Sequence, residues 1–294
     1  MTRAATLRSL LCNHGMAIAP GAYDPLTAIL VAQAGFPAVY MTGAGTSVAH
    51  GYPDFGLLSG SEMVANASRM AGAIEIPLVA DADTGYGNEL NVVRTVRDYE
   101  RAGVAGIHLE DQVAPKRCGH LDDKEIVPRE DWLAKIRAAA YARRDPDFLV
   151  IARTDARAVA GFEEAIARAN AALAAGADMA FVEAPQTMEE VAAVPRLVRG
   201  PCLLNVVRGG KTPELDLREA EAAGYKLAIV PGLLLKAVIG ACDAMLQALK
   251  ATHRHPAPPV DMTVRDGFNR VGAREWDALR TRFRTEIEQR RAAE

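Results

Sequence analysis

Hydrophobic and polar positions alternate in blocks along most of the chain. Short apolar runs of strand length are separated by amphipathic segments from residue 16 to about residue 250. The pattern predicts eight strands, at residues 16–20, 38–42, 77–81, 106–110, 148–154, 179–183, 202–206 and 227–231. Helical patterns between them include residues 90–102, 129–143 and 162–175. Eight strands that are each followed by a helix predict an α/β fold, a TIM-type (β/α)8 barrel, in preference to an open doubly wound sheet.

The pattern changes after residue 250. Residues 251–259 (ATHRHPAPP) form a Pro-rich connector, and a charged helical segment follows at about residues 274–291. We therefore predict a catalytic barrel over residues 1–250 and a connector with additional C-terminal helices over residues 251–294. The extra helix is suited to packing between subunits. The two histidines of the connector are a less favoured metal site.

Composition agrees with one large barrel and excludes several classes of partner. The 294 residues are 50% hydrophobic and carry a net charge of only −3, and no basic stripe precedes the final helix, so no nucleic-acid partner is expected. No apolar window is long enough for a membrane span, and the chain is expected to be soluble, untargeted and cytoplasmic. The cysteines show no CxxC pair, which fits a reducing cytosol. Cys202 and Cys242 are predicted to be buried.

Polar side chains gather at the ends of the predicted strands. Five different strands have polar residues at or just after their C-terminal ends, namely Asp81, Glu110, Arg153 with Asp155, Glu183 and Asn205. In a (β/α)8 barrel these ends form the rim on which active sites are built. A single residue of this kind could simply cap a helix, but five together predict one site. Arg153 would grip a carboxylate through two parallel hydrogen bonds, and a salt bridge to Glu183 is a compatible alternative.

The acidic residues of the rim predict a metal site. Asp81 and Asp83 are two positions apart at one strand end, and Glu110 ends the next strand. Neighbouring carboxylates repel each other unless a cation lies between them, and their oxygens favour a hard ion such as Mg²⁺ or Mn²⁺. Asp54, in YPDFG, is an outer candidate ligand.

A basic loop surrounds one cysteine. In APKRCGH, Cys118 lies between Lys116, Arg117 and His120, next to a turn at Gly119. Nearby positive charge is expected to lower the pKa of the thiol towards neutrality, which would suit a group that delivers or accepts a proton. The alternative is a basic loop that only holds an anion.

Two glycine-rich segments resemble nucleotide motifs without matching them. TGAGTSV lacks the third glycine of a dinucleotide fingerprint, and NVVRGGKT has Asn205 where a P-loop needs its first glycine. Thr42, Gly43 and Ala44 are instead predicted to form a backbone cradle for an anion. Lys211 would contact substrate if its loop closes.

The motifs together resemble the isocitrate lyase and phosphoenolpyruvate mutase superfamily. YMTGAGTS, DADTGYGN, IHLEDQVAPKRCGH, IARTDAR, FVEA and NVVRGGKTP occur in the order that the superfamily shows. The resemblance extends over nearly the whole chain. Within the superfamily, the chain is similar to the short branch that includes 2-methylisocitrate lyase, 2,3-dimethylmalate lyase, oxaloacetate hydrolase and carboxyvinyl-carboxyphosphonate phosphorylmutase.

The resemblance implies a role for each matching residue. Cys118 would protonate the departing enolate, with Tyr40 as a partner base for the 2-hydroxyl group and with Arg153 and His120 beside them. The implied substrate-binding set is Thr42, Gly43, Ala44, His108, Lys116, Gly119, Arg153, Glu183 and Asn205. The implied metal set, which would hold Mg²⁺ or Mn²⁺ largely through water, is Asp54, Asp81, Asp83 and Glu110. A homotetramer is also implied, in which neighbouring subunits swap the last barrel helix.

Departures from the family narrow the substrate. Val206 and Val207 stand where the isocitrate and methylisocitrate enzymes carry hydroxyl residues, which disfavours a tricarboxylate and favours an apolar branch. Arg208 stands where relatives often carry an acid, so no named substrate transfers directly. The expected reaction is Mg²⁺-dependent cleavage of a small substituted 2-hydroxy dicarboxylate to a 2-oxo acid and a carboxylate. Alternatives are an oxaloacetate hydrolase or decarboxylase, a phosphonomutase, and a catalytically silent barrel that binds an acidic metabolite.

Overall fold

The structure is a computed structural model that describes residues 1–13 and 15–293, with side chains described up to residue 285. It divides into two compact units, residues 1–236 and the chain from residue 237 onward.

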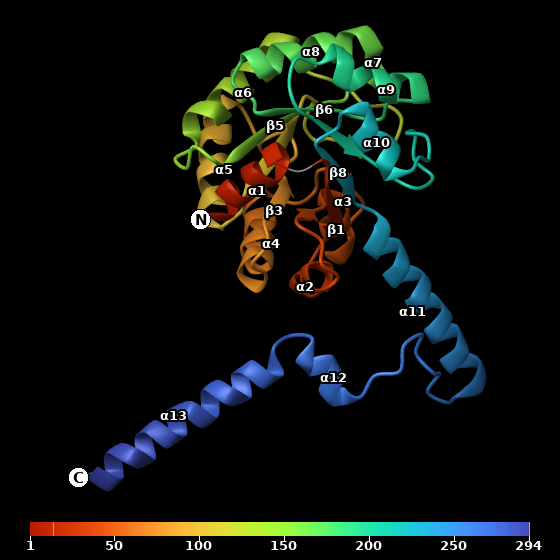
Figure 1. Ribbon diagram of the computed structural model, residues 1–294. Helices are drawn as coiled ribbons and strands as arrows, with labels where there is room; N and C mark the ends of the chain where they lie inside the picture. Colours follow the sequence, from red (N-terminus) through yellow and green to blue (C-terminus); the bar gives the residue numbers. More distant parts are fainter. Residues whose placement is uncertain (14, 294) are drawn as a thin grey trace. The chain divides into compact units, whose positions relative to one another are not determined.

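Eight parallel strands close into a barrel in the first unit, with each strand paired to the next and β1 paired to β8 (Figure 1). The strands are β1 (Ala17–Ala22), β2 (Val39–Met41), β3 (Leu78–Asp81), β4 (Gly106–Glu110), β5 (Leu149–Thr154), β6 (Met179–Val182), β7 (Cys202–Asn205) and β8 (Leu227–Val230). The predicted (β/α)8 barrel is confirmed. The first strand was predicted too short at its end, because Gly21 and Ala22 still pair with Tyr40 and Met41.

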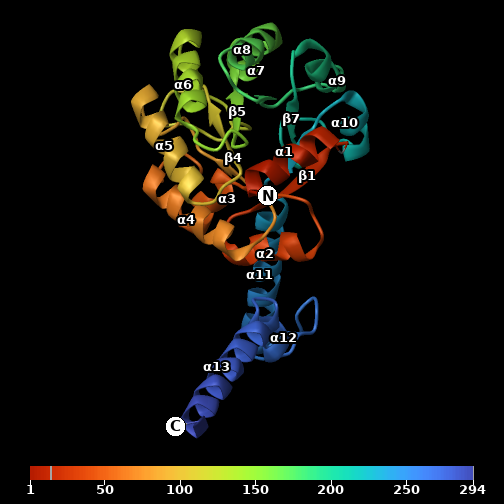
Figure 2. The ribbon, with the colours of Figure 1, turned by 60° about the vertical axis from the view of Figure 1, so that its left-hand side comes forward.

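One helix precedes the first strand, and the other helices follow the strands around the outside of the barrel (Figures 1 and 2). They are α1 (Arg3–Asn13), α2 (Pro25–Gln33), α3 (Gly43–Ala49), α4 (Gly60–Ala73), α5 (Glu89–Arg101), α6 (Arg129–Ala142), α7 (Ala156–Val159), α8 (Phe162–Ala174), α9 (Met188–Leu197), α10 (Leu217–Ala223) and the start of α11 (Leu233–Thr252). Several begin where a polar side chain satisfies the free N–H groups of the first turn. Asp24, Ser59 and Asn88 each form a capping box of this kind.

Helix α1 packs against the end of the barrel at which the strands begin. Leu7 and Leu11 belong to the same buried cluster as Ala17 and Leu149, which lie at the starts of β1 and β5. The Arg8 guanidinium donates to the carbonyl oxygens of the two residues that precede β5, and to Asp178 at 2.8 Å. The opposite end, where the strands finish, is therefore the open end of the barrel.

The barrel interior is filled by side chains from alternate strand positions. Tyr40, Val79, Ile151, Phe181 and Leu203 form one buried cluster. Residues on the outer face of the strands pack against the helices, so the strands are buried on both faces. This explains why the strands appear in the sequence as continuous apolar runs.

The second unit contains the rest of α11, α12 (Val264–Asn269) and α13 (Ala273–Ala293). The predicted C-terminal helix at 274–291 corresponds to α13, whereas α12 was not predicted. Cys242 is exposed, so the prediction that it is buried was wrong. The reason is that it lies on α11, none of whose residues is buried within the chain. Among the described helices, none is both long enough and apolar enough to cross a membrane.

Candidate active site

A cavity of about 200 Å³ lies at the C-terminal ends of the strands. Most of the predicted site residues line it, namely Tyr40, Thr42, Ala44, Asp54, Asp81, Cys118, Gly119, His120, Arg153, Glu183 and Asn205. They come from different strands and from loops far apart in sequence, so the barrel brings the predicted rim residues to one place. Five predicted residues are not in the lining, namely Gly43, Asp83, His108, Glu110 and Lys116.

The apolar part of the lining was only partly predicted. Val207, Pro231 and Leu235 form it, with the stem of Lys236 beside them. Val207 was predicted from the sequence to favour an apolar branch of the substrate. The other three residues follow β8 and were not predicted, because that strand end carries no polar rim residue. The Lys236 ammonium donates to the carbonyl oxygen of Arg208 at 2.5 Å.

Arg208 itself does not take part in the cavity. Its guanidinium is exposed and lies 3.6 Å from the exposed carboxylate of Glu214. The substitution noted in the sequence therefore places no charge in the lining.

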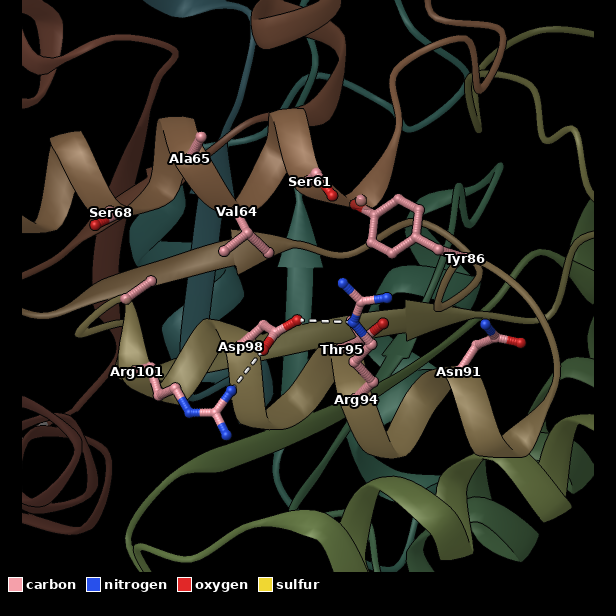
Figure 3. A pocket seen from close by; sticks show the side chains of 12 residues that line it. Ser61, Val64, Ala65, Ser68, Tyr86, Asn91, Arg94, Thr95, Asp98 and Arg101 are labelled. Carbon is pink, nitrogen blue, oxygen red and sulfur yellow. Dashed lines mark hydrogen bonds and ion pairs between the residues drawn. The ribbon is translucent and has the colours of Figure 1, made fainter.

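A larger pocket of about 520 Å³ lies elsewhere, between α4 and α5 (Figure 3). Ser61 and Val64 line it from α4, and Arg94 and Arg101 line it from α5. Its one carboxylate, Asp98, is already paired with both arginines, at 3.3 and 2.8 Å. No cysteine or histidine is among the residues that line it, so it lacks the groups that the rim cavity brings together.

The acidic cluster begins at the end of β3. Asp83 has a positive φ of 46°, a left-handed conformation that is uncommon for residues other than glycine. Its N–H donates to Asp81 at 2.9 Å, so the turn folds back on the first carboxylate. The ammonium of Lys116 lies between Asp54 and Asp83, at 2.5 and 3.0 Å. Lys116, which was predicted to bind substrate, thus contacts the acidic cluster in this structure.

The carboxyl groups of this cluster differ in pKa. Burial raises the pKa of Asp83 to about 6, helped by the negative charges of Asp81 and Asp54. Burial also raises the pKa of Glu110 well above its usual value. For Asp81, burial is outweighed by His108, which is protonated in the acid range where Asp81 titrates, and by the charges of Lys116 and Arg153, so its pKa falls to about 2.

This donor set fits a divalent cation. Glu110 Oε1 is buried without a hydrogen-bond or ion-pair partner among the described residues. Asp83 Oδ1 and Glu110 Oε2 are also buried without a hydrogen bond, and each faces one cation at 3.0 Å, Lys116 and Arg153 respectively. Buried carboxylate oxygens in that state are stabilised by a cation. In the part of the chain that the structure describes, no three Asp, Glu, His or Cys side chains are close enough to hold a metal by direct ligation alone. A divalent cation held here would therefore take part of its ligands from water.

Arg153 is the central cation of the site. Its guanidinium bonds both oxygens of Asp155, at 3.0 and 3.2 Å, and lies 3.0 Å from Glu110 and 3.5 Å from Glu183. It also lies over the ring of Phe181, 5.3 Å from the centroid. Arg153 thus forms the salt bridge to Glu183 and also lines the cavity, the two compatible roles predicted from the sequence.

Tyr40 and His108 form a buried pair beneath the cavity. The Tyr40 hydroxyl lies 2.8 Å from His108 Nε2 and 3.4 Å from Asp81. Burial raises the pKa of Tyr40 well above 10 and lowers that of His108 to about 4. Both rings are therefore neutral near pH 7, and Tyr40 is a hydrogen-bond donor in this state rather than a free base.

The loop that carries Cys118 is held over the cavity. The Cys118 N–H donates to the carbonyl oxygen of Asp54 at 3.2 Å. The Lys211 N–H donates to His120 Nδ1 at 3.1 Å, which places the His120 proton on Nε2, 3.2 Å from Glu183. Lys211 thus contacts the loop through its backbone. Its side chain pairs with Asp122.

The expected fall in the pKa of Cys118 was wrong. Burial raises the pKa of this thiol, and the carboxylate of Asp54 adds to the effect. The two basic neighbours in sequence act elsewhere, because the Lys116 ammonium pairs with carboxylates and the Arg117 guanidinium lies 5.6 Å from the centre of the Phe55 ring. The thiol is consequently protonated at neutral pH, the form that an acid needs.

Comparison with known proteins identifies the family. The family model for phosphoenolpyruvate phosphomutase matches residues 7–250. The chain belongs to this family. It is thereby a member of the isocitrate lyase/PEP mutase superfamily of lyases and mutases, and it is an enzyme of the carbon–carbon lyase type.

The similar proteins carry out related reactions. The 2,3-dimethylmalate lyase of Eubacterium barkeri is 48% identical over 85% of this chain and 87% of its own length. A 2-methylisocitrate lyase of Aeropyrum pernix is 43% identical over 83% and 78%. The solved structure of an oxaloacetate acetylhydrolase with 3,3-difluorooxalacetate has a TM-score of 0.91 at 38% identity, over 95% and 96%. A phosphonopyruvate hydrolase solved with oxalate and Mg²⁺ has a TM-score of 0.86 at 32% identity, over 96% and 99%.

Proposed function

We propose that the protein is a Mg²⁺-dependent lyase for a small 2-hydroxy dicarboxylate with an alkyl branch, of the 2,3-dimethylmalate type. The products would be a 2-oxo acid and a carboxylate. The observation that carries the proposal is the lining of one cavity, where Cys118 and Arg153 share a small space with Val207 and Leu235. A thiol acid, a carboxylate-binding cation and an apolar wall are the groups that such a substrate requires.

Each group has a defined part in the reaction. Arg153 would bind the substrate carboxylate, and the backbone at Thr42, Gly43 and Ala44 would bind the carboxylate end of the oxo acid. When the bond between the hydroxyl-bearing carbon and its neighbour breaks, the electron pair goes to the neighbouring carbon and the hydroxyl-bearing carbon becomes a carbonyl. The proton of the 2-hydroxyl would leave through Tyr40, which lines the cavity and contacts His108 Nε2 at 2.8 Å. Cys118 would donate the proton that the neighbouring carbon receives, because burial keeps its thiol protonated.

The metal would be held by the acidic cluster. Asp81, Asp83 and Glu110 would bind it largely through water, with Asp54 supporting that shell. Bound Mg²⁺ would stabilise the negative charge that develops on the substrate oxygens. Glu183 and Asn205 would complete the pocket, and His108 would support it through its contact with Tyr40. Gly119 and His120 would contact the substrate from the Cys118 loop, and Lys116 would join that loop to the acidic cluster.

The acetylhydrolase neighbour makes oxaloacetate cleavage the second candidate. The apolar side chains of Val207 and Leu235 favour the branched substrate over oxaloacetate, which has no alkyl group to contact them. Phosphonomutase chemistry is less favoured, because it does not use the thiol acid. Decarboxylation is a further alternative that the same experiment tests.

We also propose a cytoplasmic homotetramer in which subunits exchange α11. Leu246 and Leu249 are 63% and 45% exposed in the single chain, a cost that a neighbouring subunit would remove. A solution mass of one subunit would contradict this assembly.

The deciding experiment measures release of pyruvate or glyoxylate from 2,3-dimethylmalate, malate and methylisocitrate, and of oxalate from oxaloacetate, with Mg²⁺ or EDTA. We expect metal-dependent cleavage of 2,3-dimethylmalate that falls about 100- to 10,000-fold in Cys118→Ser, the contribution of a positioned acid. Cys12→Ser, at an exposed thiol on α1, is the matched control. Undiminished cleavage in Cys118→Ser would remove the thiol from the mechanism, and preferred cleavage of oxaloacetate would establish the hydrolase.

A further inference from the structure

Lys124 lies in the same loop as Cys118 but has no part in the reaction proposed above. The loop leaves and rejoins the barrel through a short antiparallel bridge between Gln112 and Ile126. Two backbone hydrogen bonds of 2.9 Å flank that bridge, from Val113 to Glu125 and from Val127 to Asp111. Residues 113–125 therefore form one loop, and Cys118, Gly119 and His120 of this loop line the cavity.

The Lys124 side chain is buried although it belongs to a loop. Only 2% of it is exposed, and its ammonium bonds Asp155 at 2.9 Å and the carbonyl oxygen of Gly119. The first contact joins the loop to the end of β5, and the second holds the turn that immediately follows Cys118. A buried ammonium is tolerated only while such partners are in place, so its burial depends on the loop being closed.

Asp155 connects this contact to the substrate-binding cation. Its two oxygens accept from Arg153 at 3.0 and 3.2 Å, and one of them also accepts from Lys124. Its N–H donates to Asp111 at 2.8 Å, so the backbone under the carboxylate is fixed as well. Departure of the loop would remove one of the two cations on Asp155 and leave Arg153 with a less confined partner.

The other ionic contacts of the loop are less suited to hold it. Lys211 pairs with Asp122, whose side chain is 84% exposed, and exposed pairs contribute little. Lys116 pairs with Asp54 and Asp83, which we assign to the metal cluster. His120 also reaches a buried partner, Glu183 at 3.2 Å, but burial lowers the pKa of His120 and leaves its ring neutral near pH 7. Among these contacts, that of Lys124 is the one in which a charged side chain of the loop meets a buried partner outside the metal cluster.

We propose that Lys124 is the latch of the Cys118 loop: its ammonium holds the loop closed on Asp155 and thereby fixes Arg153. Lys124 is a positioning residue, since it reaches the reacting groups only through Asp155 and the Gly119 backbone. The effect of Lys124 on catalysis rests on the proposed function, whereas closure of the loop by Lys124 does not depend on it.

The test uses the reactivity of Cys118, which the closed loop shields. In a Cys12→Ser/Cys242→Ser background only Cys118 and the buried Cys202 remain. Alkylation of each by iodoacetamide is followed by mass spectrometry without substrate. We expect Lys124→Met to accelerate the labelling of Cys118 about 10- to 100-fold, the worth of one buried charge-assisted hydrogen bond. Lys124→Arg, which keeps the charge, should restore part of the protection.

Two internal comparisons make the result specific. Cys202 is 1% exposed in β7, so equal acceleration at Cys202 would show general unfolding and overturn the latch. Lys226→Met, at the start of β8 and the opposite end of the barrel, should leave the labelling of Cys118 unchanged. An unchanged rate in Lys124→Met would also overturn the proposal. Faster labelling in a protein that cleaves no acid of the panel would support the latch and refute the proposed function.

Discussion

At the scale of the residue, burial decides how the titratable groups of the site behave. Cys118 follows two basic residues in the chain, yet the thiol has a raised pKa because it is shielded from water and faces Asp54. Tyr40 is kept neutral by burial in the same way. Asp83 shows that even a nearby ammonium does not fully offset desolvation.

The raised pKa of Cys118 has a measurable consequence. The thiolate is the form that reacts with iodoacetamide, and its fraction grows only as the pH approaches the pKa of the thiol. Because that pKa is raised from 9.0, the alkylation rate of Cys118 should still be increasing at pH 9. Mass spectrometry over a pH series gives the profile, with the exposed Cys12 followed in the same samples. A plateau below about pH 8 would mean that the basic neighbours control the thiol after all.

At the scale of the element, the site is separated from the features that stabilise the barrel. The polar residues lie at the ends of the strands, whereas α1 covers the end where the strands begin. Residues at one end of the barrel can therefore serve catalysis and those at the other end stability, as is usual for this fold.

Truncation of a side chain in α1 should therefore lower stability and leave cleavage intact. Leu7 is fully buried, so Leu7→Ala should reduce the free energy of unfolding by about 3 to 5 kcal/mol. Denaturant unfolding gives this difference, and kcat for the preferred acid should stay within about twofold of wild type where the variant is folded. Leu26→Ala, at a leucine 49% exposed on α2, is the control and should change little. A loss of kcat in Leu7→Ala would show that the two ends of the barrel are coupled.

At the scale of the whole molecule, the first unit carries a concentration of buried carboxylates. Asp81, Asp83, Glu110, Asp155 and Glu183 are all buried at one end of the barrel. The positive side chains among them lower the pKa values of Glu110 and Asp83 but do not offset burial, so both pKa values stay raised. A cation would lower those pKa values and relieve the repulsion.

The stability of the protein should accordingly depend on pH and Mg²⁺ together. A carboxyl group with a raised pKa in the folded state favours folding when protonated, so the contribution of Asp83 is present below about pH 4 and is lost as the pH rises through about 6. Mg²⁺ binds the ionised form and should raise Tm more at pH 8 than at pH 5. Thermal unfolding with Mg²⁺ or EDTA measures both effects, and Asp83→Asn should weaken them. An equal Mg²⁺ shift at both pH values would contradict this linkage.

The sequence by itself determined the fold and the place of the site. Buried strands leave apolar runs of fixed length, and parallel strands must end at one rim, so the residues after each run were predicted to meet. This rule alone was enough to predict that the acidic residues and Arg153 lie at one site. The pattern also located the C-terminal helix α13, but it missed α12. It missed the exposure of Cys242 as well, because an apolar helix has the same pattern whether or not its own chain covers it.

Only the tertiary structure decided what each group does in its surroundings. A pKa depends on burial and on charges that are distant in sequence, so neither the protonated state of Cys118 nor the pairing of Lys116 with Asp83 could be predicted from neighbours in the chain. Lys124 follows two aspartates and has the sequence pattern of a solvated turn, yet its charge is buried against Asp155, 31 positions away. The apolar wall at Leu235 was equally hidden, since a leucine at the start of a helix carries no sign of the cavity that it lines.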